Sequence, residues 1–134
     1  QYDNRFDISR IMRSKQAIDA LGALAQESRL AVFKLLVRAG EEEMPAGEIA
    51  RDLRVPASTM STHLAILERA GLIQSRREGR TIFYSANLDG MTDLMAFLIE
   101  DCCEGRAELC TPLTGIVQRA ACCEGSQKKT RRRV

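Results

Sequence analysis

Five cysteines, all after residue 101, are the side chains of this chain whose type and spacing best suit chemistry. They form a vicinal pair, a single residue shortly after it and a second vicinal pair: Cys102, Cys103, Cys110, Cys122 and Cys123. In a reducing compartment, cysteines serve more often as metal ligands or redox groups than as structural disulfides. The grouping therefore indicates a thiol site in the C-terminal part of the chain.

The first three cysteines can bind one ion without a nitrogen or carboxylate ligand. Cys102 and Cys103 project about 100° apart on a helix, and Gly105 lets the chain leave that helix so that Cys110 can fold back. Three thiolates suit a thiophilic ion of pyramidal geometry, which points to arsenite or antimonite. Zinc prefers a closed tetrahedron, usually of spaced cysteines or histidines, and the only histidine is His63. The residues thus predict an As(III) or Sb(III) site.

Other uses of these thiols stay open. Cadmium or lead could occupy the same soft site, and oxidation of the thiols could act as a redox switch. A thiol oxidoreductase built on the first vicinal pair is a weaker alternative, because no histidine or lysine lies near it in sequence to lower its pKa. Cys122 and Cys123 could provide additional ligands, at the end of a short helix opened by Thr111 and Pro112, or form a separate chelator.

A helix with two distinct faces is predicted upstream of the cysteines, from Ala57 to Ala70. Met60, Leu64 and Leu67 recur at the spacing of one buried helical face. The opposite face carries short polar side chains without a carboxylate: Ser58, Thr59, Ser61, Thr62 and His63. Such a face fits the major groove, and the helix N-terminus presents free N–H groups to phosphates. We therefore expect this helix to bind double-stranded operator DNA.

The neighbouring segments complete a DNA-binding motif. Upstream, GEIARDLRV predicts a short helix, and only Arg54, Val55 and Pro56 separate the two, which is the spacing of a helix-turn-helix. Downstream, two alternating segments around 77–80 predict a β-hairpin, or wing. Three arginines give this hairpin a local positive charge that suits contacts with phosphates: Arg76, Arg77 and Arg80.

Helical periodicity predicts three more helices, over 15–25, 28–39 and 89–101. The last carries more apolar residues than a helix that covers a small domain needs: Met91, Leu94, Met95, Phe97, Leu98 and Ile99. We expect it to present one face to its own domain and another to a second copy. A homodimer would hold two DNA-binding helices one turn of DNA apart, ~34–36 Å.

Composition predicts one domain, 15–104, between an N-terminal arm, 1–14, and a cysteine-containing extension, 105–134, with a basic, disordered tail. The tail holds five of the 20 basic residues, and without it 15 basic residues face 18 acidic ones. Basic charge is therefore local to the tail and the DNA-binding motif. No apolar run could span a membrane and no signal segment opens the chain, so we expect a cytoplasmic protein with no membrane partner.

Three segments, ESRLAVFKLL, ASTMSTHLAILERAGLI and GRTIFYSA, resemble the ArsR/SmtB family of metal-responsive transcriptional repressors in order and spacing. The resemblance covers about Ala17 to Leu98. It implies a winged helix-turn-helix homodimer, mostly α with a β-hairpin wing and of order α-α-α-α-β-β-α, that releases operator DNA when an inducer binds. Such a protein is a repressor and not an enzyme.

The cysteines place the chain with the arsenic-responsive type of that family, since some of those members have a vicinal pair at this helix end and a third cysteine soon after. The third-helix cysteine motif of other relatives is absent. Pro56 replaces the usual Ser or Thr cap, so the capping hydrogen bond is absent or comes from elsewhere. A DNA-binding protein without any inducer is the remaining alternative.

Overall fold

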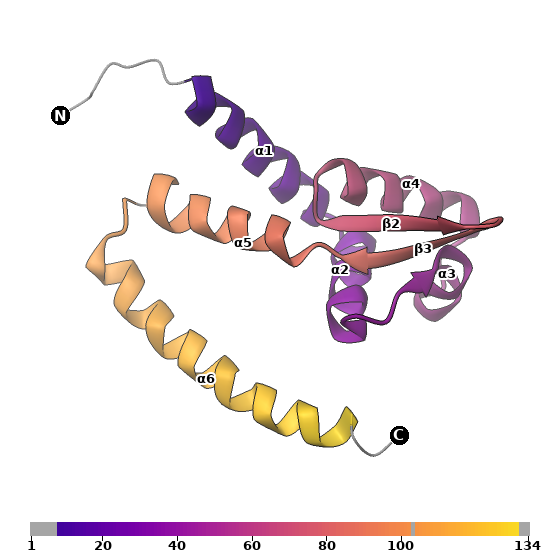
Figure 1. The fold of residues 1–134 in the computed structure, drawn as a ribbon. Helices are drawn as coiled ribbons and strands as arrows, with labels where there is room; N and C mark the ends of the chain where they lie inside the picture. The colour runs from indigo at the N-terminus through magenta and orange to yellow at the C-terminus, as the bar shows by residue number, and fades with distance from the viewer. Residues whose placement is uncertain (1–7, 103, 132–134) are drawn as a thin grey trace. The chain divides into compact units, whose positions relative to one another are not determined.

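The structure divides into two units. A computed structural model describes the backbone of residues 8–102 and 104–131 and the side chains of residues 14–100 and 104–120. The first unit ends at Met95 and the second begins at Ala96; Figure 1 labels most of their elements. No helix in the described part of the chain is long and apolar enough to cross a membrane.

Four helices precede the wing in the described part of the first unit. They are α1 (Ile8–Leu24), α2 (Glu27–Ala39), α3 (Ala46–Leu53) and α4 (Ala57–Arg69). Gly40 ends α2 with a φ of 64°, as its position in the sequence predicts. The first helix begins at Ile8, earlier than the predicted residue 15. No glycine or proline interrupts the chain between Ile8 and Gly22, so the helix can extend over this segment. Residues 8–14 of the predicted arm thus belong to α1, and residues 1–7 lie outside the described residues.

The predicted hairpin is present and forms part of a small antiparallel sheet. Its strands are β2 (Ile73–Glu78) and β3 (Thr81–Ala86), paired so that Glu78 lies opposite Thr81. A two-residue strand, β1 (Met44–Pro45), pairs with the other edge of β3 and gives the order β1-β3-β2. Periodicity cannot reveal so short a strand, and Pro45, predicted to open the next helix, is the residue just before α3.

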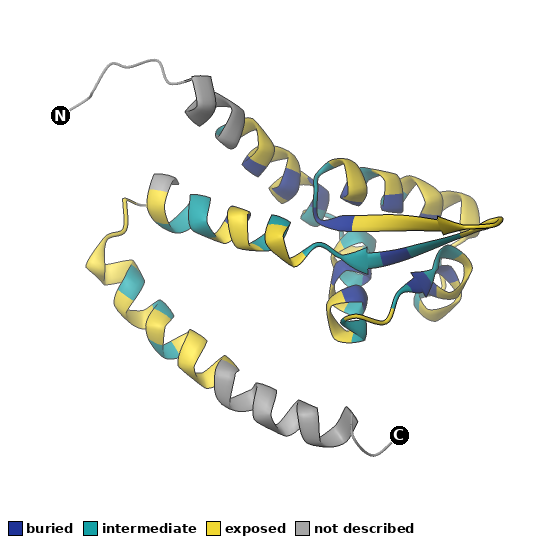
Figure 2. Cartoon of the chain, viewed as in Figure 1, coloured by how far each residue is buried: buried dark blue, intermediate teal, exposed yellow. Residues whose placement is uncertain are grey.

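The core of the first unit lies where α2, α3 and α4 meet the sheet. Its largest fully buried side chains are apolar: Leu36, Ile49, Met60, Leu64, Leu67, Leu72, Ile73 and Val32. Figure 2 shows buried residues gathered at this junction and exposed residues along most of β2. The apolar face predicted for the helix over 57–70 is therefore the face that packs, which leaves its polar face outward.

The last predicted helix is divided by a change of helix type. It consists of α5 (Leu88–Ala96) and a π-helix, η1 (Phe97–Cys102), which belongs to the second unit. The angle of about 100° expected between neighbouring cysteines holds for an α-helix, and Cys102 lies instead in η1. Glu104 and Gly105 then adopt φ values of 55° and 60°, so the chain does leave the helix at Gly105 as predicted.

A single long helix follows this turn. α6 runs from Ala107 to Arg131 and contains Pro112. The prediction that Thr111 and Pro112 open a short helix is wrong, because the chain is already helical for one turn before the proline. The prediction of a disordered tail is wrong for 128–131, whose lysines, threonine and arginine continue α6; lysine and arginine are good helix formers.

Candidate nucleic-acid interface and thiol site

The helix-turn-helix is formed by α3, a three-residue turn and α4, which we call the recognition helix. Arg54 ends α3 in the left-handed region, with φ 56° and ψ 43°, and the Val55 N–H donates to the Ala50 carbonyl at 3.0 Å. Pro56 precedes α4 and provides no side-chain capping bond. The first N–H groups of the recognition helix therefore have no side-chain partner at that position and can bind phosphate oxygens.

The polar face of the recognition helix is open to solvent over most of the predicted DNA-contacting residues. Those with exposed side chains are Ser58, Thr59, Ser61 and Thr62. The Thr62 hydroxyl donates to the Ser58 carbonyl at 3.4 Å, within the helix. Its oxygen keeps lone pairs that can accept from the amino group of a base, so the bond does not remove it from the interface.

His63 differs from these four residues because it lies at the edge of the exposed face and is half-buried. Its Nδ1 atom is buried and has no hydrogen-bond partner among the described residues. Helical periodicity places His63 between the polar face and Met60, so an intermediate exposure follows from its position. Only part of the imidazole is thus available to DNA in this conformation.

Arg76 of the wing is already engaged by acidic side chains. Its Nε donates to Glu43 Oε2 at 2.9 Å and its Nη1 to Glu78 Oε2 at 2.8 Å, and its guanidinium lies 5.0 Å from the Phe83 ring centroid. The hydrogen bonds that Arg76 donates to Glu78 and Glu43 raise the pKa of its guanidinium. Its charge is compensated, so a simple phosphate-binding role is less favourable than the sequence suggests.

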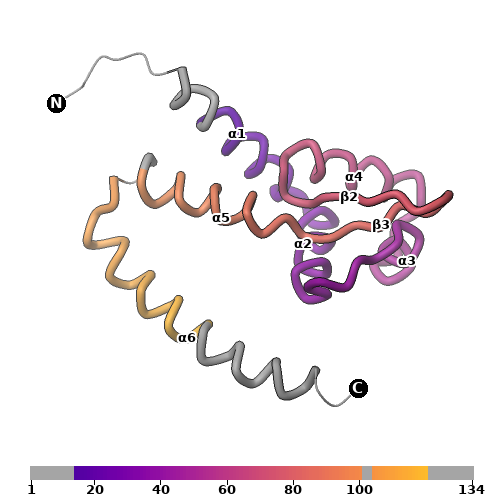
Figure 3. Tube along the Cα trace, in the orientation of Figure 1, coloured from indigo at the N-terminus to yellow at the C-terminus, as the bar shows by residue number. Residues whose placement is uncertain are grey.

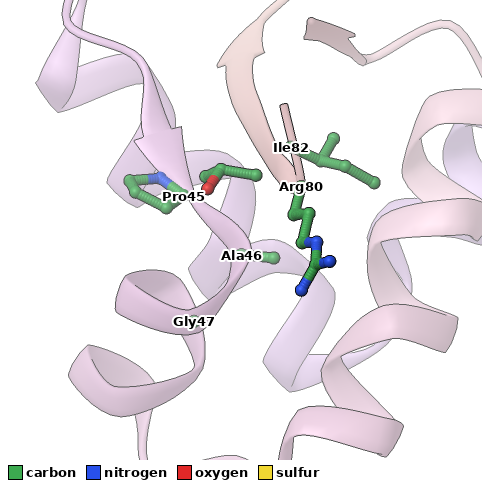
Figure 4. Close-up of a pocket in the computed structure, with 6 residues that line it drawn as sticks. Pro45, Ala46, Gly47, Arg80 and Ile82 are labelled. Carbon is green, nitrogen blue, oxygen red and sulfur yellow. The ribbon is translucent and has the colours of Figure 1, made fainter. Parts of the chain in front are cut away.

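Arg77 and Arg80 are exposed and have no ion pair within the described residues. Arg80 also lines a pocket of about 250 Å³ beside the start of α3, together with Pro45, Ala46, Gly47, Thr81 and Ile82. Figure 4 shows the Arg80 side chain extending from the wing into the space beside Ala46. These two arginines therefore remain the stronger candidates for phosphate contacts on the wing.

The predicted thiol site falls largely outside the described side chains. Cys103 lies outside the described residues altogether, and only the backbone of Cys102, Cys122 and Cys123 is described. Cys110 is a half-buried free thiol in the first turns of α6. The described side chains contain no group of three or more potential metal ligands. The three-cysteine site therefore stays a prediction.

The continuous α6 constrains how the two cysteine groups could be used. Cys122 lies twelve positions after Cys110 in this helix, which corresponds to about 18 Å along the axis. Two thiolates so far apart cannot bind one ion while the helix is intact. Cys122 and Cys123 could share a site with Cys102 only without Cys110. This limit was not evident from the sequence, because Pro112 suggested a break.

Comparison with known proteins agrees with the geometry of the helix-turn-helix and the wing. The helix-turn-helix domain family HTH_20 matches residues 24–76. The transcriptional activator HlyU of Vibrio cholerae is 35% identical over 85 residues, which cover 61% of this chain and 76% of HlyU. The solved structure described as reduced HlyU aligns with a TM-score of 0.53 at 30% identity, covering 67% of this chain and 93% of the other.

Two further solved structures share this fold. An ArsR-like transcriptional regulator from Rhodococcus sp. RHA1 has a TM-score of 0.59 at 26% identity, covering 80% of this chain and 94% of that chain. The homodimeric winged helix-turn-helix DNA-binding domain from Mycobacterium bovis has a TM-score of 0.58 at 24% identity over 78% of this chain and 96% of its own, which supports the fold. The recognition helix, the wing and these relatives together show that the chain belongs to the ArsR family of winged helix-turn-helix transcriptional regulators.

Proposed function

We propose that this protein is a transcriptional repressor that binds operator DNA as a homodimer and releases it when trivalent arsenic or antimony binds its cysteine thiolates. The observation that carries the DNA-binding part is the exposed polar surface of the first turns of α4, formed by short side chains without a carboxylate; in the wing, Arg77 and Arg80 are exposed and have no ion pair among the described residues. Because the family consists of regulators and not enzymes, the thiol oxidoreductase alternative is dropped.

Exposed apolar side chains support the homodimer. Ile18 and Leu21 of α1 are 67% and 43% exposed, and Leu88 and Met95 of α5 are 60% and 45% exposed. Large apolar side chains at this exposure favour a protein partner. A second copy is the simplest partner, since the Mycobacterium bovis relative of this fold is described as homodimeric.

The proposal for the inducer rests on the chemistry of the donor set and on the chain reversal after Cys102. Glu104 and Gly105 turn the chain between η1 and α6, and the Gly105 N–H donates to the Ile99 carbonyl at 2.8 Å. Such a turn is what Cys110 needs to approach the vicinal pair. Binding there must couple to DNA binding by a few kcal/mol to move a dimer from mostly bound to mostly free.

A thiol redox switch is the second candidate, and one observation favours it. HlyU, which is 35% identical to this chain, has a solved structure described as reduced, and vicinal thiols can be oxidised. Cadmium or lead at the same thiolates is the other alternative.

A gel-shift titration separates these candidates. The probe is the DNA upstream of the gene for this protein, and arsenite, antimonite, cadmium, zinc or hydrogen peroxide is added in turn. We expect release by arsenite and antimonite at concentrations where zinc has no effect. Release by peroxide alone, reversed by a reductant, would favour the redox switch instead. Release by none of them would leave a DNA-binding protein without this kind of inducer.

A further inference from the structure

Asn87 lies between β3 and α5. It forms hydrogen bonds both to the loop that follows the recognition helix and to the first turn of α5. Its backbone N–H donates to the Leu72 carbonyl at 2.9 Å, and its Nδ2 donates to the Gly71 carbonyl at 3.0 Å. Its Oδ1 accepts from the Gly90 N–H at 3.3 Å, as an N-cap of α5 does. One side chain therefore links the loop after α4 to the first turn of α5.

Gly90 makes the two backbones meet directly. A Cβ at position 90 would lie 2.0 Å from the Gly71 carbonyl oxygen, which is backbone and cannot rotate away. Only glycine therefore permits this approach of α5 to the loop. Contact between two backbones is stiffer than contact through long side chains, so a shift of the start of α5 has to move the loop with it.

The loop is in turn fixed to the end of the recognition helix. The Gly71 N–H donates to the Glu68 carbonyl at 3.0 Å and the Leu72 N–H to the Leu67 carbonyl at 3.1 Å, which closes the last turn of α4. Ser75 of β2 also donates its hydroxyl to Glu68 Oε1 at 2.6 Å. The path from α4 into β2, and from β3 into α5, can be followed in Figure 3.

We propose that Asn87 is a positioning residue for the recognition helix, and that its amide bond to Gly71 is the contact through which α5 fixes the orientation of α4. Selective binding of operator DNA requires that orientation, whereas non-specific attraction to phosphates does not. The inference extends to the inducer, resting there on the proposed function: a change that reaches α5 on arsenite binding passes to α4 through the same contact.

The substitution Asn87→Asp tests the amide bond separately from the cap. Aspartate is as good an N-cap as asparagine and can still accept from the Gly90 N–H. It cannot donate to the Gly71 carbonyl, and its carboxylate repels that oxygen. Asn87→Ser is a second variant that keeps a capping oxygen without an amide donor. Gln26→Ala is the matched control, because Gln26 Oε1 caps α2 by accepting from the Arg29 N–H at 2.8 Å, away from the junction.

The measurement is the ratio of affinities for operator and random duplexes of equal length, by fluorescence anisotropy on the full-length protein at one salt concentration. We expect Asn87→Asp and Asn87→Ser to lower this ratio about tenfold, the equivalent of 1.4 kcal/mol, while random DNA binds as before. Gln26→Ala should leave the ratio unchanged even though its melting temperature falls. The variants at position 87 should also show a smaller fold-change in operator affinity when arsenite is added.

If the folded Asn87→Asp and Asn87→Ser proteins keep the wild-type ratio of operator to random affinity, the inference is overturned. Capping of α5 would then be sufficient to account for the role of Asn87. A wild-type protein that binds the operator but ignores arsenite would refute the proposed inducer, and the ratio would still decide the role of Asn87. A wild-type protein that does not distinguish operator from random DNA would overturn both.

Discussion

The two neighbouring arginines of the wing should differ in their contribution to DNA binding. Arg77 is exposed and unpaired among the described residues, whereas Arg76 donates to Glu43 and Glu78. An unpaired guanidinium can neutralise a phosphate and release its counterion. A guanidinium that is already held by two carboxylates must first give them up. We therefore expect Arg77→Ala, and not Arg76→Ala, to remove a phosphate contact.

The size of the effect follows from counterion release. Each phosphate contact contributes about 0.9 to the slope of log affinity against log salt concentration, so a homodimer that loses one contact per protomer loses about 1.8. Between about 50 and 200 mM salt, wild-type affinity should then fall roughly 12-fold more than the affinity of Arg77→Ala. The change should be the same for operator and random DNA, because phosphates carry no sequence information.

Fluorescence anisotropy at several salt concentrations measures both slopes. Arg76→Ala serves as the control, and its slope should stay near that of the wild-type protein. A slope for Arg77→Ala equal to the wild-type slope would refute the phosphate contact. An equal loss of slope in both variants would show that the ion pairs of Arg76 in the free protein do not decide which arginine binds DNA.

Three further predictions concern the thiols and the core. In the full-length protein, Cys110→Ser should abolish release of operator DNA by arsenite, while a double Cys122→Ser and Cys123→Ser variant should retain it; the opposite result in gel shifts would assign the third ligand to the second pair. Burial, and next the charge of Glu68, raise the pKa of Tyr84, so its contribution to stability is present below about pH 10 and lost as the pH rises through the folded-state pKa. Urea titrations at about pH 9 and pH 11 should show that alkaline loss of stability is smaller in Tyr84→Phe than in wild type. Leu64→Ala should lower the free energy of unfolding by ~2–5 kcal/mol, because Leu64 is 0% exposed; a loss under about 1 kcal/mol would contradict its central place in the core.

The sequence predicts the DNA-binding elements well because each has a local signature. Helical periodicity identifies α4, and α3 lies close enough to be recognised from the turn at 54–56. Alternation around Gly79 identifies the hairpin. These signals depend on residues a few positions apart, which is the range over which backbone geometry determines which side chains share a face.

Contacts between distant segments have no such signature. The ion pair between Arg76 and Glu43 joins residues 33 positions apart, and the tie between Asn87 and Gly71 joins residues 16 positions apart. The second unit is harder still to predict from the sequence, because proline normally interrupts a helix and Pro112 lies within α6. The thiol site could be predicted only from donor chemistry, and its ligands remain a prediction.

An anisotropy titration of the operator complex with arsenite measures directly whether the proposed inducer releases DNA. We expect the wild-type homodimer to release DNA fully at about one arsenite per protomer, as a three-thiolate site in each chain requires. A protein with Cys102→Ser and Cys103→Ser should bind the same DNA with unchanged affinity and should not respond. Undiminished operator binding by the wild-type protein in excess arsenite, or release that is identical in the cysteine variant, would refute release of DNA through arsenite at these thiolates.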